Sequence, residues 1–339
     1  MFKKFYRGII DFVKEEWVFL VTIITISIIC CWPVNYYIVI GGGISDVSSR
    51  IEVSEDYDSK GSFNISYVSE LKGTVLSYLL SYVIPSWDRE NMNDYKYSDG
   101  EDYKDIEFRG DIDLKSANAN AIKTAYSLAE KKYEEISSKI YVIATFDEYE
   151  TSLKVGDELI GIDDKTFDNV EDYSKYIQNF KVNDLVVVKV IRDGKKVDVK
   201  CKLNEELGVR LFGVAFQIVK EYETDPKISI NFLPSESGPS GGLITTLEIY
   251  NSLVKKDITK GYKIAGTGTV DNLGRVGDIG GVRYKVIGAS AGGADVFLVP
   301  AGKNYKEAKE VAKEKRLNIK IISVSTVEEA IEKLGKFNK

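Results

Sequence analysis

The sequence predicts an α/β protein that carries a small β-rich module and one transmembrane helix near its N-terminus. Three observations predict this class. Residues 17–40 contain no charged side chain, residues 139–204 alternate apolar and polar positions as antiparallel strands do, and residues 205–339 alternate short apolar runs with helical periodicity. With 44% hydrophobic and 29% charged residues in 339, the composition excludes wholesale disorder.

The charge balance and the residue types exclude several function classes. The formal net charge is −6, from 46 basic and 52 acidic residues, so the sequence gives no indication of a nucleic-acid partner. The chain contains no histidine. Without imidazole, a Ser-His-Asp triad, a Cys-His dyad and an HExxH zinc site are all excluded. We therefore expect no metal and no cofactor, and any catalytic base must be Lys, Asp or Glu.

The N-terminal segment predicts a membrane anchor. Residues 1–16 form a basic tail, and the 24 uncharged residues 17–40 reach roughly 36 Å as a helix, enough for a hydrocarbon core of about 30 Å. Lysine and arginine are denser before this segment than after it, which predicts a cytoplasmic N-terminus and an extracytoplasmic catalytic part. A cleaved signal peptide is the alternative, but the segment is long and no A-x-A-like site follows it.

Residues 41–138 are predicted to form an extracytoplasmic region, and the sequence leaves open which domain they belong to. The pattern predicts a strand over 62–69, a helix over 72–83, an exposed irregular stretch over 87–113 and a helix over 114–137. The strand and the second helix have no obvious role in the β-rich module. We therefore hypothesise that they complete the sheet of the C-terminal domain, so that the β-rich module is an insertion in it.

The β-rich module contains a recognisable series of elements. Strands are predicted over 140–145, 184–192 and 197–203, with a tight turn at Asp193-Gly194 and a helix over 170–180. The run LKVGDELIGIDDKTF (153–167), that helix and VVVKVIRDGKKVDVKCKL (186–203) resemble a PDZ domain. The resemblance implies recruitment of an extended peptide beside a strand. A clear Gly-Leu-Gly-Phe carboxylate loop is missing before the second strand, where TFDEYETS (145–152) is acidic, so no peptide-binding residues are assigned.

The remaining chain, 205–339, is predicted to alternate strands and helices. The strands are expected over 228–232, 262–270, 295–299 and 319–324, and the helices over 238–250, 282–289, 305–317 and 326–334. Cys201 falls in register with the apolar residues of its strand, which predicts a core position for that thiol.

The first candidate for chemistry is the serine of Gly238-Pro239-Ser240-Gly241-Gly242. Ser240 stands at the predicted start of a helix, whose N-terminus favours developing negative charge. The flanking glycines Gly238 and Gly241 let backbone N–H groups approach a reacting carbonyl. Taken alone, the same five residues also describe an ordinary turn and helix cap.

The second candidate is Lys285, which shares a helix face with Val282 and Ala289. A lysine on an apolar face loses water, and desolvation disfavours the ammonium form, as a general base requires. An ordinary surface lysine that snorkels to solvent is the alternative.

Taken together, the two candidates resemble the proteolytic domain of Lon-type serine peptidases. A Gly-Pro-Ser motif, the Thr267-Gly268 turn, the run Gly274–Gly281 and a lysine 45 residues after the serine occur in the family's order. The resemblance implies Ser240 as nucleophile, Lys285 as base and Thr267 as the threonine that holds the lysine amine. Ser237 departs from the acidic residue that many members carry before Gly-Pro-Ser, and Glu236 replaces it only if the loop shifts by one residue.

The whole layout, one span followed by a PDZ-like and a Lon-type domain, is similar to the membrane-anchored PDZ–Lon-like peptidases of Gram-positive bacteria. No Gly-x4-Gly-Lys-[Ser/Thr] loop occurs in the sequence. The resemblance implies an ATP-independent serine endopeptidase that acts on exported or membrane proteins, contacts lipid through its span and self-associates.

Two other functions remain open at this stage. Small-molecule phosphotransferases of a related fold also place a serine-containing Gly-rich loop at a helix start, and 234–240 fits that spacing loosely. The second is a non-catalytic membrane-tethered adaptor whose PDZ-like module holds a partner.

Overall fold

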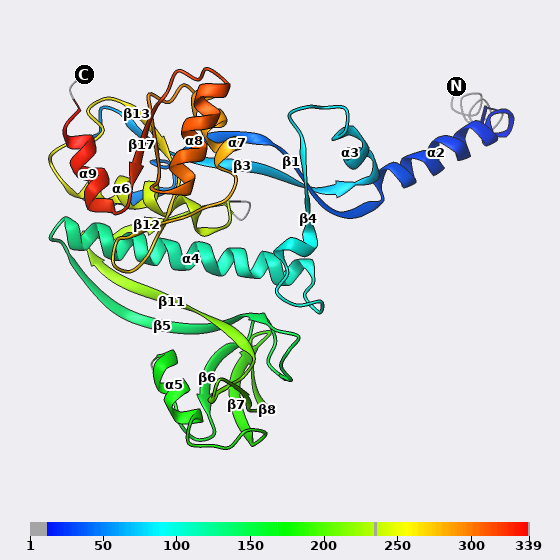
Figure 1. Cartoon of the computed structure of the whole chain (residues 1–339), viewed down its shortest axis with the longest axis vertical. Helices are drawn as coiled ribbons and strands as arrows, with labels where there is room; N and C mark the ends of the chain where they lie inside the picture. Colours follow the sequence, from blue (N-terminus) through cyan, green and yellow to red (C-terminus); the bar gives the residue numbers. More distant parts are fainter. Residues whose placement is uncertain (1–11, 168, 234–235, 338–339) are drawn as a thin grey trace, which may run out of the picture. The chain divides into compact units, whose positions relative to one another are not determined.

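The computed structural model describes residues 12–167, 169–233 and 236–337 of the chain. The described chain forms two compact units (Figure 1). The smaller unit comprises the chain up to Gly41 together with Ser69–Tyr95, and the larger one comprises Gly42–Val68 and Lys96–Lys339. The strands β1 (Pro33–Asp46) and β3 (Ser62–Thr74) contribute residues to both units.

The smaller unit contains a helix, a short sheet and one further helical turn. The helix α2 (Trp17–Cys31) has no buried residue, and its C-terminal neighbour Trp32 is already extended. The first half of β1 pairs antiparallel with β4 (Asp88–Asn91), and the 3-10 helix η1 (Met92–Tyr95) follows directly. The short helix α3 (Val75–Leu80) begins with a reciprocal cap between Thr74 and Ser77.

The predicted helix over residues 17–40 is wrong in its second half. The helical residues end at Cys31, and residues 33–40 belong to β1. The physical reason is Pro33, which has no N–H to continue the helical ladder and which biases the preceding residue to an extended conformation. Among the described residues, no helix has both the length and the apolar character needed to cross a membrane.

The larger unit is built on a sheet whose strand order is β17-β16-β13-β3-β1 within that unit. The strands β13 (Lys263–Gly266), β16 (Val296–Pro300) and β17 (Lys320–Val324) run parallel, and β3 lies parallel to β13. The predicted strands in the C-terminal region match these positions, except that 262–270 is broken at Thr267 into β13 and the short β14 (Thr269–Val270).

Helices cover both faces of this sheet, giving three layers (Figure 1). Neighbouring residues of one strand point to opposite faces, as Val296 and Phe297 do, because side chains alternate along a strand. One face packs against helices α4 (Tyr103–Leu128), α6 (Gly242–Leu253) and α9 (Val327–Gly335). The other packs against α7 (Val282–Ala291) and α8 (Lys303–Glu314).

The region before the β-rich module contributes to this sheet. Ser62–Ile65 of β3 pair residue by residue with Lys263–Gly266 of β13, 201 positions later in the sequence. The helix that follows differs from the predicted one: α4 begins at Tyr103, inside the stretch 87–113 expected to be irregular, and ends at Leu128. Asp102 caps it with a reciprocal Asp105 contact, a signal that the high charge of the segment obscured.

The β-rich module is a five-stranded antiparallel sheet of order β11-β5-β6-β7-β8 with one helix. Its elements are β5 (Lys132–Thr145), β6 (Glu158–Ile162), α5 (Val170–Ile177), β7 (Leu185–Arg192), β8 (Lys195–Lys202) and β11 (Val214–Asp225). A separate core holds these elements together, and Cys201 lies fully buried in it. The core position predicted for this thiol is therefore confirmed, and burial raises its pKa to about 12.

The strand β11 joins the module to the rest of the larger unit. Phe216 and Ile218 pack against the module's core, whereas the intervening Gln217 donates a hydrogen bond of 2.8 Å from Nε2 to Ser116 Oγ on α4. The helix α4 therefore lies along the opposite face of β5 and β11 (Figure 1). The sheet extends beyond residue 204, where the sequence pattern placed the end of the module.

The short elements complete the fold. Three two-stranded pairs join β9 (Asn204–Glu206) to β10 (Val209–Leu211), β12 (Ile228–Ile230) to β2 (Ile51–Val53), and β14 to β15 (Val276–Gly277). The 3-10 helix η2 (Pro239–Gly241) leads directly into α6.

Candidate active site

Ser240 lies in η2, at the turn that opens α6. Gly238 before it has φ 88° and ψ 161°, a backbone conformation that a side chain would strain. Its N–H donates to the carbonyl of Gly110 on α4 at 3.1 Å. A Cβ atom on Gly241 would come within 2.7 Å of Ile65 Cδ1, so a larger residue there requires the Ile65 side chain on β3 to shift. Gly238 and Gly241 thus shape the turn that presents the serine.

Lys285 lies in α7 with only 5% of its surface exposed. The helix begins after Gly281, which is left-handed with φ 68°. Val282, Val286 and Ala289 on the same helix are fully buried, and the carbonyl of Lys285 accepts a 2.7 Å hydrogen bond from Ser66 Oγ of β3. The predicted apolar helix face is therefore observed, and the alternative of a solvent-exposed lysine is excluded.

The fold brings the two candidate residues together. Lys285 Nζ donates to Ser240 Oγ over 2.9 Å, although 45 residues separate them in the chain. Ser240 belongs to η2 and Lys285 to α7. The carboxyl end of β13 lies between these two helices. A hydroxyl and an amine at this separation can exchange a proton without a further movement of the backbone.

Thr267, directly after β13, contacts both residues. Its hydroxyl donates to the Ser240 carbonyl at 3.1 Å and accepts from Lys285 Nζ at 3.3 Å. Because the single hydroxyl proton is directed at the carbonyl, a lone pair faces the amine. Gly268 N–H donates to the same carbonyl at 2.8 Å. The Ser240 turn is thereby tied to the end of the central strand.

The position of Ser240 also provides for negative charge. The N–H groups at the start of η2 and α6 carry the positive end of the helix dipole. An oxyanion formed on a carbonyl attacked by Ser240 Oγ would lie close to these groups. The residues together can support nucleophilic attack and proton transfer. No group of three or more His, Cys, Asp or Glu side chains with metal-ligand geometry occurs among the described residues.

Sequence reasoning missed one ion pair beside the turn. Arg50 donates to Glu236 from Nε and Nη2 at 3.0 Å, and Glu236 also accepts from the N–H of Leu233 at 2.7 Å. Burial raises the pKa of Glu236, but these hydrogen bonds outweigh it and the pKa lies below its usual range. Glu236 is thus engaged by Arg50, while Ser237 next to it is exposed. No sequence pattern links positions 50 and 236.

The sequence assigned no peptide-binding residues in the module, and β11 lies beyond the stretch 139–204 that was expected to form it. The edge strands of the module are β8 and β11, and Phe212-Gly213 lie between β10 and β11. Gly213 has φ 70°, and a Cβ atom on it would come within 2.3 Å of Tyr149 Cβ. An apolar, glycine-containing turn at the start of an edge strand was visible in the sequence at 211–214, outside the stretch that was searched.

Comparison with protein families assigns two domains. Residues 221–335 match the Lon protease (S16) C-terminal proteolytic domain, and residues 132–203 match a PDZ domain. The chain therefore contains a Lon-type proteolytic domain and a PDZ domain, as the residue patterns indicated.

Individual relatives match the same C-terminal region. A Lon protease of Desulfatibacillum aliphaticivorans is 37% identical over 122 residues, which cover 33% of this chain and 14% of that protein. A Lon protease of Malacoplasma penetrans is 33% identical over 126 residues, covering 37% and 16%. The chain thus spans only a small part of the length of these relatives.

A solved structure matches the module. The PDZ domain of an SdrC-like protein from Listeria monocytogenes is 24% identical, covers 23% of this chain and 85% of that domain, and has a TM-score of 0.21. The corresponding domain from Listeria innocua gives a TM-score of 0.22.

Proposed function

We propose that the protein is a serine endopeptidase in which Ser240 is the nucleophile and Lys285 the general base. The observation that carries the proposal is the 2.9 Å contact between Ser240 Oγ and Lys285 Nζ in a site where the amine is almost wholly buried. The Lon-type domain match agrees with it. A phosphotransferase gives no role to Lys285 or to the PDZ domain.

The proposed reaction is acyl transfer. The neutral amine of Lys285 takes the Ser240 proton as Oγ attacks a peptide carbonyl, and backbone N–H groups of the turn around Ser240 hold the oxyanion. The carbon–nitrogen bond then breaks as the protonated lysine gives its proton to the leaving amine. Water, deprotonated by the same lysine, hydrolyses the acyl-enzyme and restores the serine. Thr267 keeps the amine directed at Oγ throughout.

Two substitutions test this proposal directly. Ser240→Ala and Lys285→Ala should each lower cleavage of an unfolded protein or a fluorogenic peptide by about 10³-fold or more, because each removes a group that takes part in bond making. Arg283→Ala, which changes an exposed residue of the same helix, is the matched control. Near wild-type turnover by either variant, with unchanged thermal unfolding, contradicts the dyad and leaves the adaptor function. The reaction is proposed to need no ATP, so added nucleotide should change no rate.

The PDZ domain is proposed to recruit peptide or protein substrates along the free edge of β11. An edge strand offers unpaired backbone groups to an added strand, and half-buried Val214, Phe216 and Ile218 flank it. Phe216→Ala should therefore lower kcat/KM for an unfolded protein relative to a short peptide severalfold. Val209→Ala, at an exposed residue of β10, is the control. An unchanged ratio for Phe216→Ala rejects recruitment at this edge.

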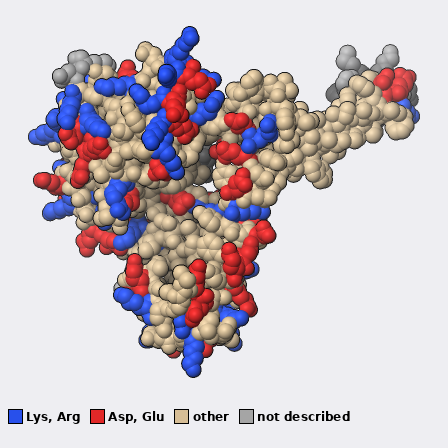
Figure 2. Space-filling model, viewed as in Figure 1, with Lys and Arg blue, Asp and Glu red and all other residues tan. Residues whose placement is uncertain are grey.

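Membrane attachment and an extracytoplasmic location are proposed from the N-terminal segment. The helix α2 has no charged residue, and its surface is free of Lys, Arg, Asp and Glu in Figure 2. Its apolar side chains are exposed, including Trp17, Phe19 and Ile23. A helix that is apolar all round needs an apolar surrounding. Full-length protein should stay with membranes in alkaline carbonate, and release into the supernatant rejects the proposal. Self-association of the chain also stays a prediction.

A further inference from the structure

A cavity of about 250 Å³ lies against the Ser240 turn, on the side formed by α4. Its walls come from four elements: α4, β11, η2 and the segment that begins with β14. They include Asp113, Asn120, Gln217, Pro239 and Thr269. Pro239 directly precedes Ser240, and Thr269 directly follows Gly268, whose N–H holds the Ser240 carbonyl. A side chain of a bound substrate near the scissile bond can therefore reach this cavity.

The polar groups of the cavity are arranged as hydrogen-bond acceptors. Asn120 Nδ2 donates to the carbonyl of Val270 at 3.1 Å, and Gln217 Nε2 donates to Ser116 Oγ at 2.8 Å. Both amides thus use an N–H donor within the protein, and no described residue donates to either amide oxygen. Each amide keeps one further N–H, but the two amide oxygens next to Asp113 can accept from a ligand that carries donors.

Asp113 supplies negative charge to the same cavity. Among the described residues, none forms a hydrogen bond or ion pair with its carboxylate. The second acid of the cavity, Asp271, differs: it accepts from the N–H of Leu273 and from Arg275, which also pairs with it at 2.6 Å. Asp113 is therefore the acid whose charge is open to a ligand.

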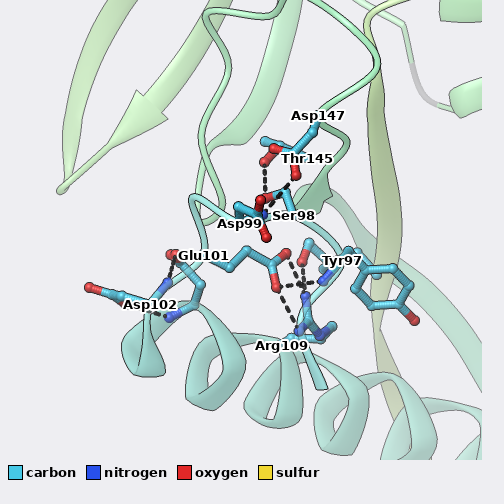
Figure 3. Close-up of polar contacts among 10 residues, drawn as sticks. Tyr97, Ser98, Asp99, Glu101, Asp102, Arg109, Thr145 and Asp147 are labelled. Carbon is cyan, nitrogen blue, oxygen red and sulfur yellow. Dashed lines mark hydrogen bonds and ion pairs between the residues drawn. The ribbon is translucent and has the colours of Figure 1, made fainter. Parts of the chain in front are cut away.

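Arg109, whose charge acts on Asp113, is also engaged by another acid. Arg109 lies one helical turn earlier on α4, and it donates to both carboxylate oxygens of Glu101 at 3.0 and 3.1 Å and to the Ile143 carbonyl at 3.0 Å. Figure 3 shows Glu101 directed at Arg109, beside Tyr97. The carboxyl of Asp113 is also desolvated, since burial raises its pKa and the charge of Arg109 lowers it only in part.

We propose that this cavity binds a lysine or arginine side chain of the substrate, close to the scissile bond, through Asp113 and the two amide oxygens. Both side chains carry only donors and a full positive charge, which match two amide oxygens and one carboxylate. A charge-assisted hydrogen bond of this kind discriminates by about tenfold or more against an uncharged side chain. This inference rests on the proposed peptidase function and names its substrate class.

The experiment uses peptides that carry one lysine, moved in turn through three positions on each side of the scissile bond, and matched peptides with norleucine. At one position, wild-type kcat/KM should be at least tenfold higher for lysine. Asp113→Asn should bring that ratio close to one. Asp111→Asn, two residues earlier on α4 and exposed, should keep the ratio, because Asp111 pairs with Lys115 at the surface.

Binding separates this inference from the peptidase function. With Ser240→Ala, fluorescence anisotropy should show the favoured lysine peptide binding about tenfold more tightly than its norleucine match, and adding Asp113→Asn should abolish the difference. If the wild type cleaves no peptide but this Asp113-dependent difference is present, the cavity assignment holds and the peptidase function fails. Equal binding of the two peptides at every position, or a lysine preference that survives Asp113→Asn, overturns the inference.

Discussion

Two regions flank the Ser240 turn, and they treat buried charge in opposite ways. On one side, the amine of Lys285 meets two hydroxyl groups, at 2.9 Å from Ser240 and 3.3 Å from Thr267. On the other, the carboxylate of Asp113 faces a cavity without a described partner. The first arrangement is pre-organised for proton transfer within the protein. The second leaves a carboxylate that a basic side chain of a substrate can pair with. We therefore propose that proton transfer and substrate selection take place on different sides of one turn.

A substitution of Thr267 tests the pre-organised side and, after those of the two proposed dyad residues, has the largest expected effect. Thr267→Val keeps the shape of the side chain but removes the hydroxyl that accepts from Lys285 and donates to Ser240. We expect kcat to fall by about 10²-fold, a loss comparable to that of other groups that orient a reacting side chain, with little change in KM. Steady-state kinetics measure it.

Thr267→Ser restores the hydroxyl and should recover most of the lost activity. If the Thr267→Val variant has the kcat of the wild type, the Ser240–Lys285 contact forms without the help of a third residue.

A second buried acid sharpens the comparison by its effect on stability. Glu248 on α6 is 8% exposed, and its pKa rises to about 7 through burial and the negative charges of Asp46, Asp257 and Asp56. In the unfolded chain the pKa is near the usual 4.5, so the folded state holds the proton more tightly. Stability from this group is fully present below pH 4.5 and is lost as the pH rises to about 7.

The size of that loss is at most about 3 kcal/mol, from the shift in pKa. Glu248→Gln should therefore be more stable than wild type at pH 8 and should lack this part of the pH dependence, as urea unfolding at pH 5 and pH 8 would show. An identical pH dependence of stability in both proteins would show that the pKa of Glu248 is not raised in the folded state.

The smallest expected effect concerns the ion pair that holds the loop before Ser240. Arg50 and Glu236 are about one quarter exposed, so solvent screens the pair and its contribution to stability is small. Arg50→Gln should lower kcat/KM a few-fold, because the loop that leads to η2 loses its attachment to the segment after β1. Peptide kinetics measure it.

Lys336→Gln, which breaks an exposed pair with Glu332 on α9, is the control and should have no effect on the kinetics. A loss as large as that of Thr267→Val would place Arg50 in the reaction itself.

The two residues of the proposed dyad could be selected from the sequence because each stands in a short motif, and because the two motifs together resemble the Lon-type domain. Glycines around Ser240 and an apolar helix face around Lys285 are properties of neighbouring positions. The α/β pattern and most strands and helices after residue 139 were predictable for the same reason, since side-chain alternation is local.

The parts that the sequence did not reveal depend on contacts between distant segments. The sequence suggested that strand 62–69 joins the C-terminal sheet, as it does, but it did not identify β13 as the partner, since no local pattern encodes a partner 201 residues away. The cavity that contains Asp113 is lined by residues of α4, β11, η2 and β14, which come from four regions of the chain. The strand over 33–40 was missed because an apolar, uncharged run suits a buried strand as well as a helix.

The most direct test of the central claim is mass spectrometry of the intact protein after reaction with a fluorophosphonate. The account predicts one adduct per chain, located at Ser240 by peptide mapping, and formed at least 100-fold more slowly in Lys285→Ala. No adduct at Ser240, or equal labelling rates in the two proteins, would show that the lysine does not activate the serine.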